Sequence, residues 1–379
     1  MIKLGRINKS IENNFVKYQV MVSSNSICRP FWYKLNKEYS EYAVIDRCDA
    51  FLPALLFAAV SSKSDIYSDL PISKDLYLQV TQHIIPQLAK LLNMPQISLH
   101  VDTTDVPIKN KGMVGTGFSK GVDSLYTIMC HTDKTKEYFP RLTHTVVIHN
   151  GVFEGENKNT IAKNLYEDAK KFSLEHNLKS IFISSNIDEI LPENYLEVVS
   201  FRIVSSILLL QKLFKIYLYS SGHGFEDFEY TRKSTGEQEL YLTHYLSTSC
   251  TKFISFGGGV RRIDKIKSLC SYKPAYDILH PCFVSFDKNC GHCKKCRRDT
   301  VTLIALNQID KFKNVYDVDF AKKNFDINVA FIIANSDFAL YKEVLGLLKE
   351  RNIPISKRSK VIAEQFKRGI EALKNEKTI

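Results

Sequence analysis

The feature that most constrains the fold of this chain is an alternation of short apolar segments and helical patterns from about residue 112 to residue 221. Apolar runs rich in β-branched residues favour buried strands, and the amphipathic stretches between them favour helices. Such β-α-β alternation predicts a doubly wound α/β fold, in which a parallel sheet binds ligands at the carboxyl ends of its strands. The predicted strands are Met113–Phe118, Thr143–Asn150, Ser180–Ser185 and Ile216–Ser221, and the predicted helices are Val122–His131, Asn159–His176 and Leu196–Phe214.

The segments on either side of this alternation follow other patterns. Phe15–Ser23 and Phe31–Leu35 have the composition of strands, and Asp49–Val60 is an apolar helix candidate. Leu76–Leu92 has helical spacing but contains Pro86, which should kink or split the helix. Amphipathic helices return after residue 310. We expect three parts: an N-terminal α/β extension over 1–108, a central ligand-binding domain over 109–310 and a helical C-terminal extension over 311–379.

Composition excludes several classes of protein. With 44% hydrophobic and 25% charged residues among 379, the chain is too apolar to be disordered. It contains no apolar run of the roughly 18 residues that a membrane span needs, and its basic start is not followed by the apolar core of a signal peptide. We therefore expect a cytoplasmic protein without a membrane partner. The net charge of +11 favours anionic partners such as nucleotides, nucleic acids or an acidic protein face.

A Gly-rich segment, Gly115-Thr-Gly-Phe-Ser-Lys-Gly-Val-Asp-Ser124, lies between a predicted strand and a predicted helix. Backbone N–H groups at such a helix start can cradle phosphate oxygens. Ser119 and Ser124 add hydroxyl groups, Lys120 adds a positive charge, and Asp123 adds a carboxylate able to hold Mg²⁺. The spacing matches neither the Walker pattern nor the dinucleotide-binding pattern, so it predicts another kind of phosphate loop.

Four of the nine cysteines lie within fifteen residues, at Cys282, Cys290, Cys293 and Cys296. Four thiolates at this spacing predict a metal site, and tetrahedral Zn²⁺ is the natural occupant. An iron–sulfur cluster and a redox Cys-x-x-Cys pair remain alternatives. His292, which lies between two of the cysteines, is expected to point away from them.

The loop Ser119-Lys-Gly-Val-Asp-Ser124 resembles the Ser-Gly-Gly-x-Asp-Ser signature of the PP-loop ATP pyrophosphatases, which adenylate a substrate and release pyrophosphate. Lys120 stands where the signature has its first Gly. If that position has a positive φ, a Lys there costs about 1 kcal/mol or more. Otherwise its ammonium group could reach the released pyrophosphate.

Together with the pattern Cys-x7-Cys-x2-Cys-x2-Cys further along the chain, the loop resembles the 7-cyano-7-deazaguanine synthase (QueC)-like branch of that superfamily. Longer QueC-like proteins occur in bacterial anti-phage islands. The resemblance covers roughly residues 112–305 and implies a Rossmann-like sheet of the adenine nucleotide alpha-hydrolase type with a four-Cys zinc module. It implies ATP, Mg²⁺ and Zn²⁺ as cofactors and an AMP- and pyrophosphate-forming ligase or synthase activity. A deazapurine-type carboxylate, such as 7-carboxy-7-deazaguanine, would be adenylated and captured by ammonia or by an amino group of a protein partner, giving an amide or a nitrile.

The resemblance also implies roles for particular residues. Catalysis would fall to Ser119, Lys120 and Asp123. The substrate would meet His223 and Arg261, although either could belong to an ordinary turn. His149 ends the second strand, where this fold meets adenosine, and a plain turn is the leading alternative there, as it is for Arg262. The candidate ATP-binding residues are Ser119, Lys120, Gly121, Val122, Asp123, Ser124 and His149, and the candidate metal ligands are Cys282, Cys290, Cys293 and Cys296.

Two other functions compete with this interpretation. One is tRNA modification by thiolation, which needs a free reactive cysteine. The other is a catalytically degenerate nucleotide sensor whose zinc module binds RNA or protein. In that case Lys294, Lys295, Arg297 and Arg298 would contact phosphates, and binding would weaken strongly with salt. This sensor ranks third, behind the two enzymes, because aromatic residues that could stack on bases are not interleaved with these charges.

Overall fold

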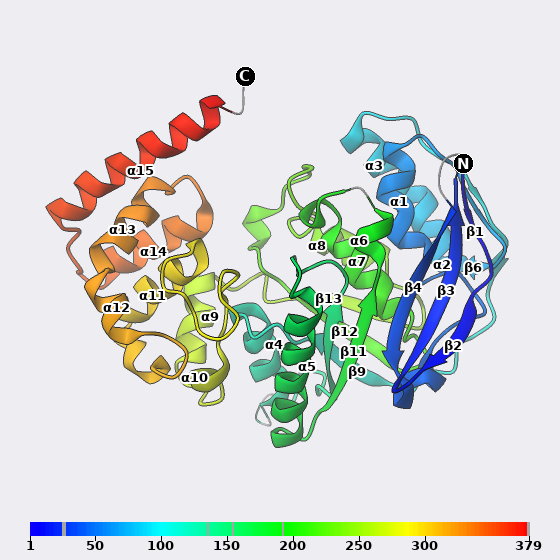
Figure 1. Cartoon of the computed structure of the whole chain (residues 1–379), viewed down its shortest axis with the longest axis horizontal. Helices are drawn as coiled ribbons and strands as arrows, with labels where there is room; N and C mark the ends of the chain where they lie inside the picture. The colour runs from blue at the N-terminus through cyan, green and yellow to red at the C-terminus, as the bar shows by residue number, and fades with distance from the viewer. Residues whose placement is uncertain (25–27, 134, 136, 154, 192, 377–379) are drawn as a thin grey trace. The chain divides into compact units, whose positions relative to one another are not determined.

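The computed structural model describes residues 1–24, 28–133, 135, 137–153, 155–191 and 193–376 (Figure 1). The chain divides into two compact units. The first, the sheet unit, consists of residues 1–118 and 131–256, and the second, the helical unit, consists of residues 119–130 and 257–379. This division differs from the expected borders at residues 108 and 310.

A mostly parallel sheet forms the centre of the sheet unit, so the chain has a mixed α/β fold. Its parallel strands run in the spatial order β13-β12-β9-β10-β11. The chain order therefore reverses at β9, which lies between β10 and β12. The middle strands are buried, as β-branched residues in a sheet covered on both faces should be; Thr145, Val146 and Val147 of β10 are at most 1% exposed. These strands are β9 (Met113–Gly117), β10 (His144–His149), β11 (Lys179–Ser185), β12 (Phe214–Ser220) and β13 (Lys252–Phe256).

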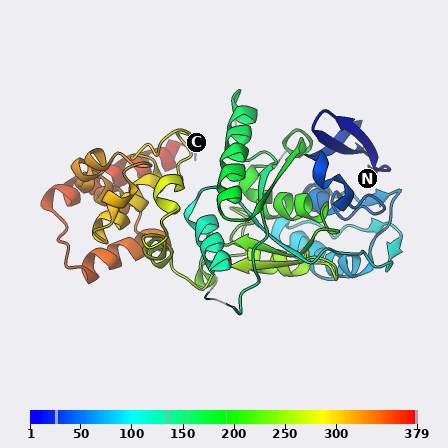
Figure 2. The ribbon, with the colours of Figure 1, turned by 90° about the horizontal axis from the view of Figure 1, so that it is seen from below.

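Helices cover this sheet on both faces. The connection through α5 (Lys158–Glu175) runs from β10 to β11, and the connection through α7 (Tyr195–Leu208) runs back from β11 to β12. Because such crossovers are right-handed, the connections through α5 and α7 run on opposite faces of the sheet. Figure 2 gives a second view of these strands and helices. Asn194 and Glu197 form a capping box at the start of α7. The remaining elements of this part are α6 (Ile187–Ile190), η3 (Phe225–Asp227) and α8 (Glu239–Tyr245).

The N-terminal strands extend the same sheet instead of forming a separate one. β4 (Cys28–Asn36) pairs antiparallel with β11, and β3 (Phe15–Ser23) pairs antiparallel with β4. Their apolar side chains share one core with α1, α3 and α7. No border therefore separates residue 108 from the parallel strands. The other elements here are β1 (Ile2–Leu4), β2 (Asn8–Glu12), η1 (Lys37–Tyr42), α1 (Leu52–Ser61), β5 (Ile66–Ser68), β6 (Ile72–Ser73), α2 (Lys74–Gln79), the π-helical turn η2 (Val80–Ile84), α3 (Ile85–Leu92), β7 (Leu99–His100) and β8 (Thr103–Thr104).

The helical unit is built around α11 (Lys294–Ala305), which packs against α9, α13 and α14. The first nine residues of α4 (Val122–Thr132) belong to this unit as well. Its described elements also include α9 (Arg262–Leu269), α10 (Ala275–Ile278), η4 (Ile309–Phe312), α12 (Val318–Lys323), α13 (Phe325–Ala334), α14 (Ala339–Glu350) and α15 (Lys357–Glu376). Residues 377–379 of the expected C-terminal extension lie outside the described residues. Among the described residues, no helix is both long enough and apolar enough to cross a bilayer.

Most predicted elements are confirmed, with ends that move by a few residues. β3 has the predicted bounds, and the predicted helix over Leu196–Phe214 ends earlier, at Leu208. The run predicted over Leu76–Leu92 is divided as expected, because a π-helical turn interrupts it directly before α3, whose first turn contains Pro86.

Candidate functional site

The segment between β9 and α4 forms a closed loop held by its own polar groups. The Ser119 hydroxyl donates to the Ser124 hydroxyl over 3.0 Å, and Ser124 donates in turn to the Gly121 carbonyl over 3.0 Å. The backbone N–H of Gly121 donates to Ser119 Oγ over 3.3 Å. The same Gly121 carbonyl accepts from the N–H of Leu125 in the first turn of α4 (Val122–Thr132). Residues 119–124, called the phosphate loop below, therefore combine a helix start with two hydroxyl groups, the arrangement that suits an anion.

Lys120, which stands where the signature has a glycine, adopts the left-handed backbone conformation. Its φ is +59°, so a glycine would fit this position with less strain. Its carbonyl accepts a hydrogen bond from the backbone N–H of His280 over 2.7 Å. The loop thus holds Lys120 in a conformation that costs about 1 kcal/mol or more, as expected for a lysine at a glycine position.

Asp123, the expected Mg²⁺ ligand, is paired with two cations of α9. Its Oδ2 lies 2.5 Å from Arg262 Nη1 and its Oδ1 lies 3.1 Å from Lys265 Nζ. Burial alone would raise the pKa of Asp123, but the charges of Arg262 and Lys265 outweigh it and hold that pKa below its usual value. Since both oxygens already have cationic partners, this arrangement does not present Asp123 as a direct magnesium ligand.

The two arginines that follow the Gly-rich segment at residue 257 have opposite environments. Arg261, the one favoured as a substrate ligand, is 54% exposed and pairs with Asp264 of its own helix. Arg262 is 8% exposed and holds Asp123 of the phosphate loop. Nothing in the sequence favours Arg262 over Arg261, because consecutive residues near a helix start point in different directions and only packing decides which is buried.

A second carboxylate completes this buried group of charges. Asp299 of α11 is fully buried; it lies 3.2 Å from Arg298 Nε and 3.8 Å from Arg262 Nη2. Sequence reasoning missed Asp299, which stands three residues after the last clustered cysteine on the same helix. We call Asp123, Arg262, Lys265, Arg298 and Asp299 the buried charge cluster. Its three cations and two carboxylates leave one positive charge beside the phosphate loop.

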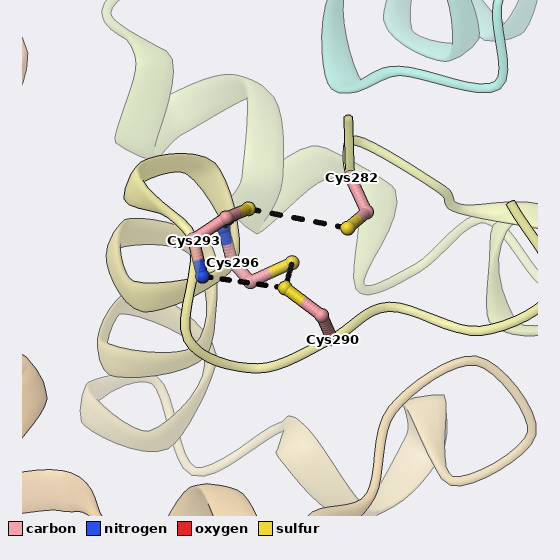
Figure 3. Close-up of side chains that lie close together, drawn as sticks. All are labelled: Cys282, Cys290, Cys293 and Cys296. Carbon is pink, nitrogen blue, oxygen red and sulfur yellow. Dashed lines mark hydrogen bonds between the residues drawn. The ribbon is translucent and has the colours of Figure 1, made fainter. Parts of the chain in front are cut away.

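The four cysteines meet as predicted, and Figure 3 shows their sulfur atoms facing one another. Cys282 and Cys290 come from irregular segments, whereas Cys293 caps α11 and Cys296 lies in its first turn. All four sulfurs lie within 4.8 Å of one another, with 4.0 Å between Cys282 and Cys293 and 3.9 Å between Cys290 and Cys296. Four sulfurs about 2.3 Å from a tetrahedral metal would be separated by about 3.8 Å, so the cluster could hold a metal ion such as zinc.

Backbone groups around the cluster favour thiolates. The N–H of Cys293 lies 3.3 Å from Cys290 Sγ, and the N–H of Cys296 lies 3.5 Å from Cys293 Sγ. Hydrogen bonding from the Cys296 side chain lowers the pKa of Cys293 to about 4, whereas burial raises the pKa of Cys290 and the hydrogen bond with Cys293 raises that of Cys296. Gly291 has φ +73°, and a Cβ there would lie 2.9 Å from the Phe320 ring, so the turn between the ligands requires glycine. His292 is exposed and its Nδ1 lies 2.8 Å from the Cys290 carbonyl, outside the group of sulfurs.

The remaining candidates, His149 and His223, belong to the sheet unit. His149 is buried at the end of β10, where its Nε2 lies 3.0 Å from Asn159 Oδ1 and burial lowers its pKa. The neighbouring Asn150 is 1% exposed, and neither polar atom of its side chain has a hydrogen-bond partner among the described residues. His223 is half-buried in the loop after β12, where its carbonyl accepts from the Ser221 hydroxyl over 2.7 Å.

The structure therefore places the phosphate loop, Arg262 and the four cysteines in one unit and the two histidines in the other. The loop lies between a strand and a helix, and the four cysteines lie together, as their sequence patterns predicted. The whole chain was then compared with known proteins. No family model, no curated protein and no solved structure matches the chain.

Proposed function

We propose that this chain is an ATP-dependent ligase or synthase of the PP-loop type, which adenylates a carboxylate and releases pyrophosphate. The observation that carries the proposal is the closed phosphate loop, which follows β9 and starts α4. β9 is also the strand at which the chain order of the parallel strands reverses. Such a reversal is the usual ligand position in Rossmann-like sheets, so the fold supports the same proposal.

In this function the phosphate loop holds the leaving pyrophosphate. Backbone N–H groups at the start of α4 bind phosphate oxygens, and Lys120 adds positive charge. The hydroxyls of Ser119 and Ser124 would turn from their partners within the loop to donate to the phosphate. The substrate carboxylate attacks the α-phosphorus of ATP, the bond to the β-phosphate oxygen breaks, and pyrophosphate leaves with that electron pair. Donors that are fixed before the reaction stabilise the charge that develops on the leaving group.

Mg²⁺ and Zn²⁺ would be bound in different ways. Mg²⁺ would arrive with the nucleotide, because Asp123 is held by Arg262 and Lys265. Zn²⁺ would be held by Cys282, Cys290, Cys293 and Cys296. Four sulfur ligands leave no open coordination position, so its role there is structural.

An amine would then attack the acyl carbon of the acyl-adenylate, and AMP would leave to give an amide. With ammonia as the acceptor, a second ATP would activate that amide for loss of water and give a nitrile. A 7-carboxy-7-deazaguanine-like acid is the substrate that the sequence resemblance suggests, and ammonia or a protein amino group is the acceptor. His223 and Arg261 remain the candidates for substrate contact. The half-buried position of His223 suits this role better than the exposed ion pair of Arg261 with Asp264.

Pyrophosphate release tests the proposal. Incubation with ATP and 7-carboxy-7-deazaguanine should release pyrophosphate and AMP, and omission of the acid should abolish the release. Ser119→Ala should slow release by about 100-fold, the effect of removing one donor from a charge that develops in the transition state. Ser10→Ala, on exposed strand β2, is the matched control and should leave the rate unchanged. Nucleotide binding without release for any carboxylate would overturn the enzymatic proposal.

A catalytically degenerate nucleotide sensor is the second candidate, because two observations favour it. Lys120 occupies a glycine-like conformation, and Asp123 is neutralised by cations. The basic surface that this candidate needs is less well supported: Arg298 is buried, and the guanidinium of Arg297 lies over the rings of Phe331 and Phe366. Tight ATP binding without turnover, combined with salt-dependent RNA binding, would favour the sensor.

A thiolation enzyme is less well supported. It needs a reactive thiol outside a metal site. Four of the five cysteines outside the cluster are buried, and burial raises the pKa of Cys48 to about 12 and that of Cys270 to about 11, so this function would have to use Cys28, the exposed one. Thiols of such high pKa are poor nucleophiles at neutral pH. Rapid alkylation of a single cysteine that also abolished activity would reverse this ranking.

A further inference from the structure

Both ends of the phosphate loop are fastened to residues that flank the cysteine cluster. At the first end, the Lys120 carbonyl accepts the backbone N–H of His280, which lies two residues before Cys282. At the second end, Asp123 pairs with Arg262, which also pairs with Asp299, three residues after Cys296. The first and the last cysteine of the cluster therefore each lie next to an anchor of the loop.

The anchor at Asp299 is shielded from solvent, and its link to Arg262 is an ion pair of 3.8 Å without a hydrogen bond. Asp299 is fully buried on α11, and Arg298 holds its other oxygen over 3.2 Å. Lys265, whose side chain is 3% exposed, supports Asp123 from the neighbouring turn of α9. Charges in such an environment interact strongly, and a buried pair is costly to break. A displacement of the first turn of α11 would therefore be transmitted to Asp123.

The anchor at His280 lies in an irregular segment that contains three of the four cysteines. Residues 279–293, all of them described, form neither helix nor strand between α10 and α11. The side chain of Asn289 ties this segment to the carbonyls of Leu279 and Val315 over 2.9 and 3.0 Å. A metal bound by Cys282 and by the cysteines at the start of α11 would join the same segment to the helix that carries Asp299. It would thereby fix the separation of the two anchors.

We propose that metal binding by the four cysteines orders the phosphate loop through these two anchors, with Arg262 and Asp299 as positioning residues. The cluster then does more than stabilise its own module: it sets the geometry in which the loop N–H groups and hydroxyls meet a phosphate. Only the last consequence of this inference rests on the proposed function: removal of the metal should weaken nucleotide binding.

Amide hydrogen exchange of the full chain without nucleotide tests the coupling. Removal of the metal by a chelator should speed exchange in the peptide that covers residues 119–125 by about tenfold or more, and added Zn²⁺ should restore protection. Peptides from β10 and β11 in the sheet unit should not change. If the amides of Cys293 and Cys296 exchange faster and the loop peptide keeps its protection, the coupling is overturned.

Variants separate the anchor from the metal itself. Asp299→Asn, with its bound metal counted by mass spectrometry, should lose loop protection while it keeps the metal, and Asp299→Glu should restore part of it. Asp264→Asn removes a surface pair on the same side of the unit and should leave the loop unchanged. Should Asp299→Asn fail to fold, Arg262→Lys provides the same test, since it keeps the charge but cannot bridge two carboxylates.

Nucleotide binding distinguishes this inference from the proposed function. The dissociation constant of ATP should rise by about tenfold when the metal is removed and fall again when Zn²⁺ is added. If the loop peptide responds to the metal while ATP does not bind in either state, the coupling stands and the proposed function fails. If ATP binds equally well in both states and the loop peptide does not respond, the coupling fails.

Discussion

Arg262→Gln offers the most direct test of the buried charge cluster. The guanidinium of Arg262 lies 2.5 Å from Asp123 and 3.8 Å from Asp299, and its side chain is only 8% exposed. Breaking a buried ion pair from one side costs about 3–5 kcal/mol, because a charge is left buried without its partner. Here Lys265 still faces Asp123 and Arg298 still faces Asp299, so we expect a loss near the lower limit, about 3 kcal/mol.

The neighbouring residue provides the matched control. Arg261 carries the same charge one position earlier, but its pair with Asp264 is 54% and 41% exposed. Exposed pairs contribute about 0–1 kcal/mol, so Arg261→Gln should leave stability almost unchanged. The comparison removes any general effect of lowering the net charge by one.

Urea unfolding can assign the effect to one unit. Trp32, the single tryptophan of the chain, lies in the sheet unit, so its fluorescence follows that unit, whereas circular dichroism also follows the helical unit. With a slope of about 1.5 kcal/mol per molar urea, a loss of about 3 kcal/mol lowers the midpoint of the helical unit by about 2 M. The fluorescence midpoint should stay in place. Equal, small shifts for Arg261→Gln and Arg262→Gln would refute the reasoning that burial makes the Arg262 pairs strong.

Three further outcomes are expected. Burial and the nearby charge of Lys179 lower the pKa of His144 to about 4, so protonation of His144 disfavours the folded sheet unit. The free energy of unfolding of this unit should therefore fall as the pH drops below about 6.5, by about 2 kcal/mol at pH 5, and His144→Gln should flatten this slope in unfolding experiments. Gly291→Ala should destabilise the helical unit by about 1–3 kcal/mol, because the new methyl group meets Phe320 and the backbone at residue 291 is left-handed. The variant should also lose its metal more readily to a competing chelator, and an unchanged urea midpoint of the helical unit would contradict the prediction. Elemental analysis should find one zinc per chain. Cys290→Ser should lower that ratio sharply, whereas Cys28→Ser, at the exposed first residue of β4, should not.

Local patterns in the sequence predicted most of the elements and the two main features of the site. The spacing of apolar residues and the positions of prolines can be seen in the local sequence. For this reason β3 has its predicted bounds, and the run that contains Pro86 is divided as expected. Cysteine spacing predicted the cluster in the same way, because ligands a few residues apart are brought together by one turn. The serine and glycine positions likewise predicted a loop that starts a helix, since the chemistry of a helix start is local.

Contacts between distant segments decided the rest. Nothing near Asp123 in the sequence indicates that Arg262 and Asp299 will hold it, and that partnership changes its role from a predicted magnesium ligand to an anchor of the loop. The pairing of β4 with β11, which joins the N-terminal strands to the parallel sheet, is equally invisible along the chain. Short-range spacing determines which groups a turn or helix presents, but the free energy of burying a charge or extending a sheet depends on which surfaces meet, and only the folded chain brings them together.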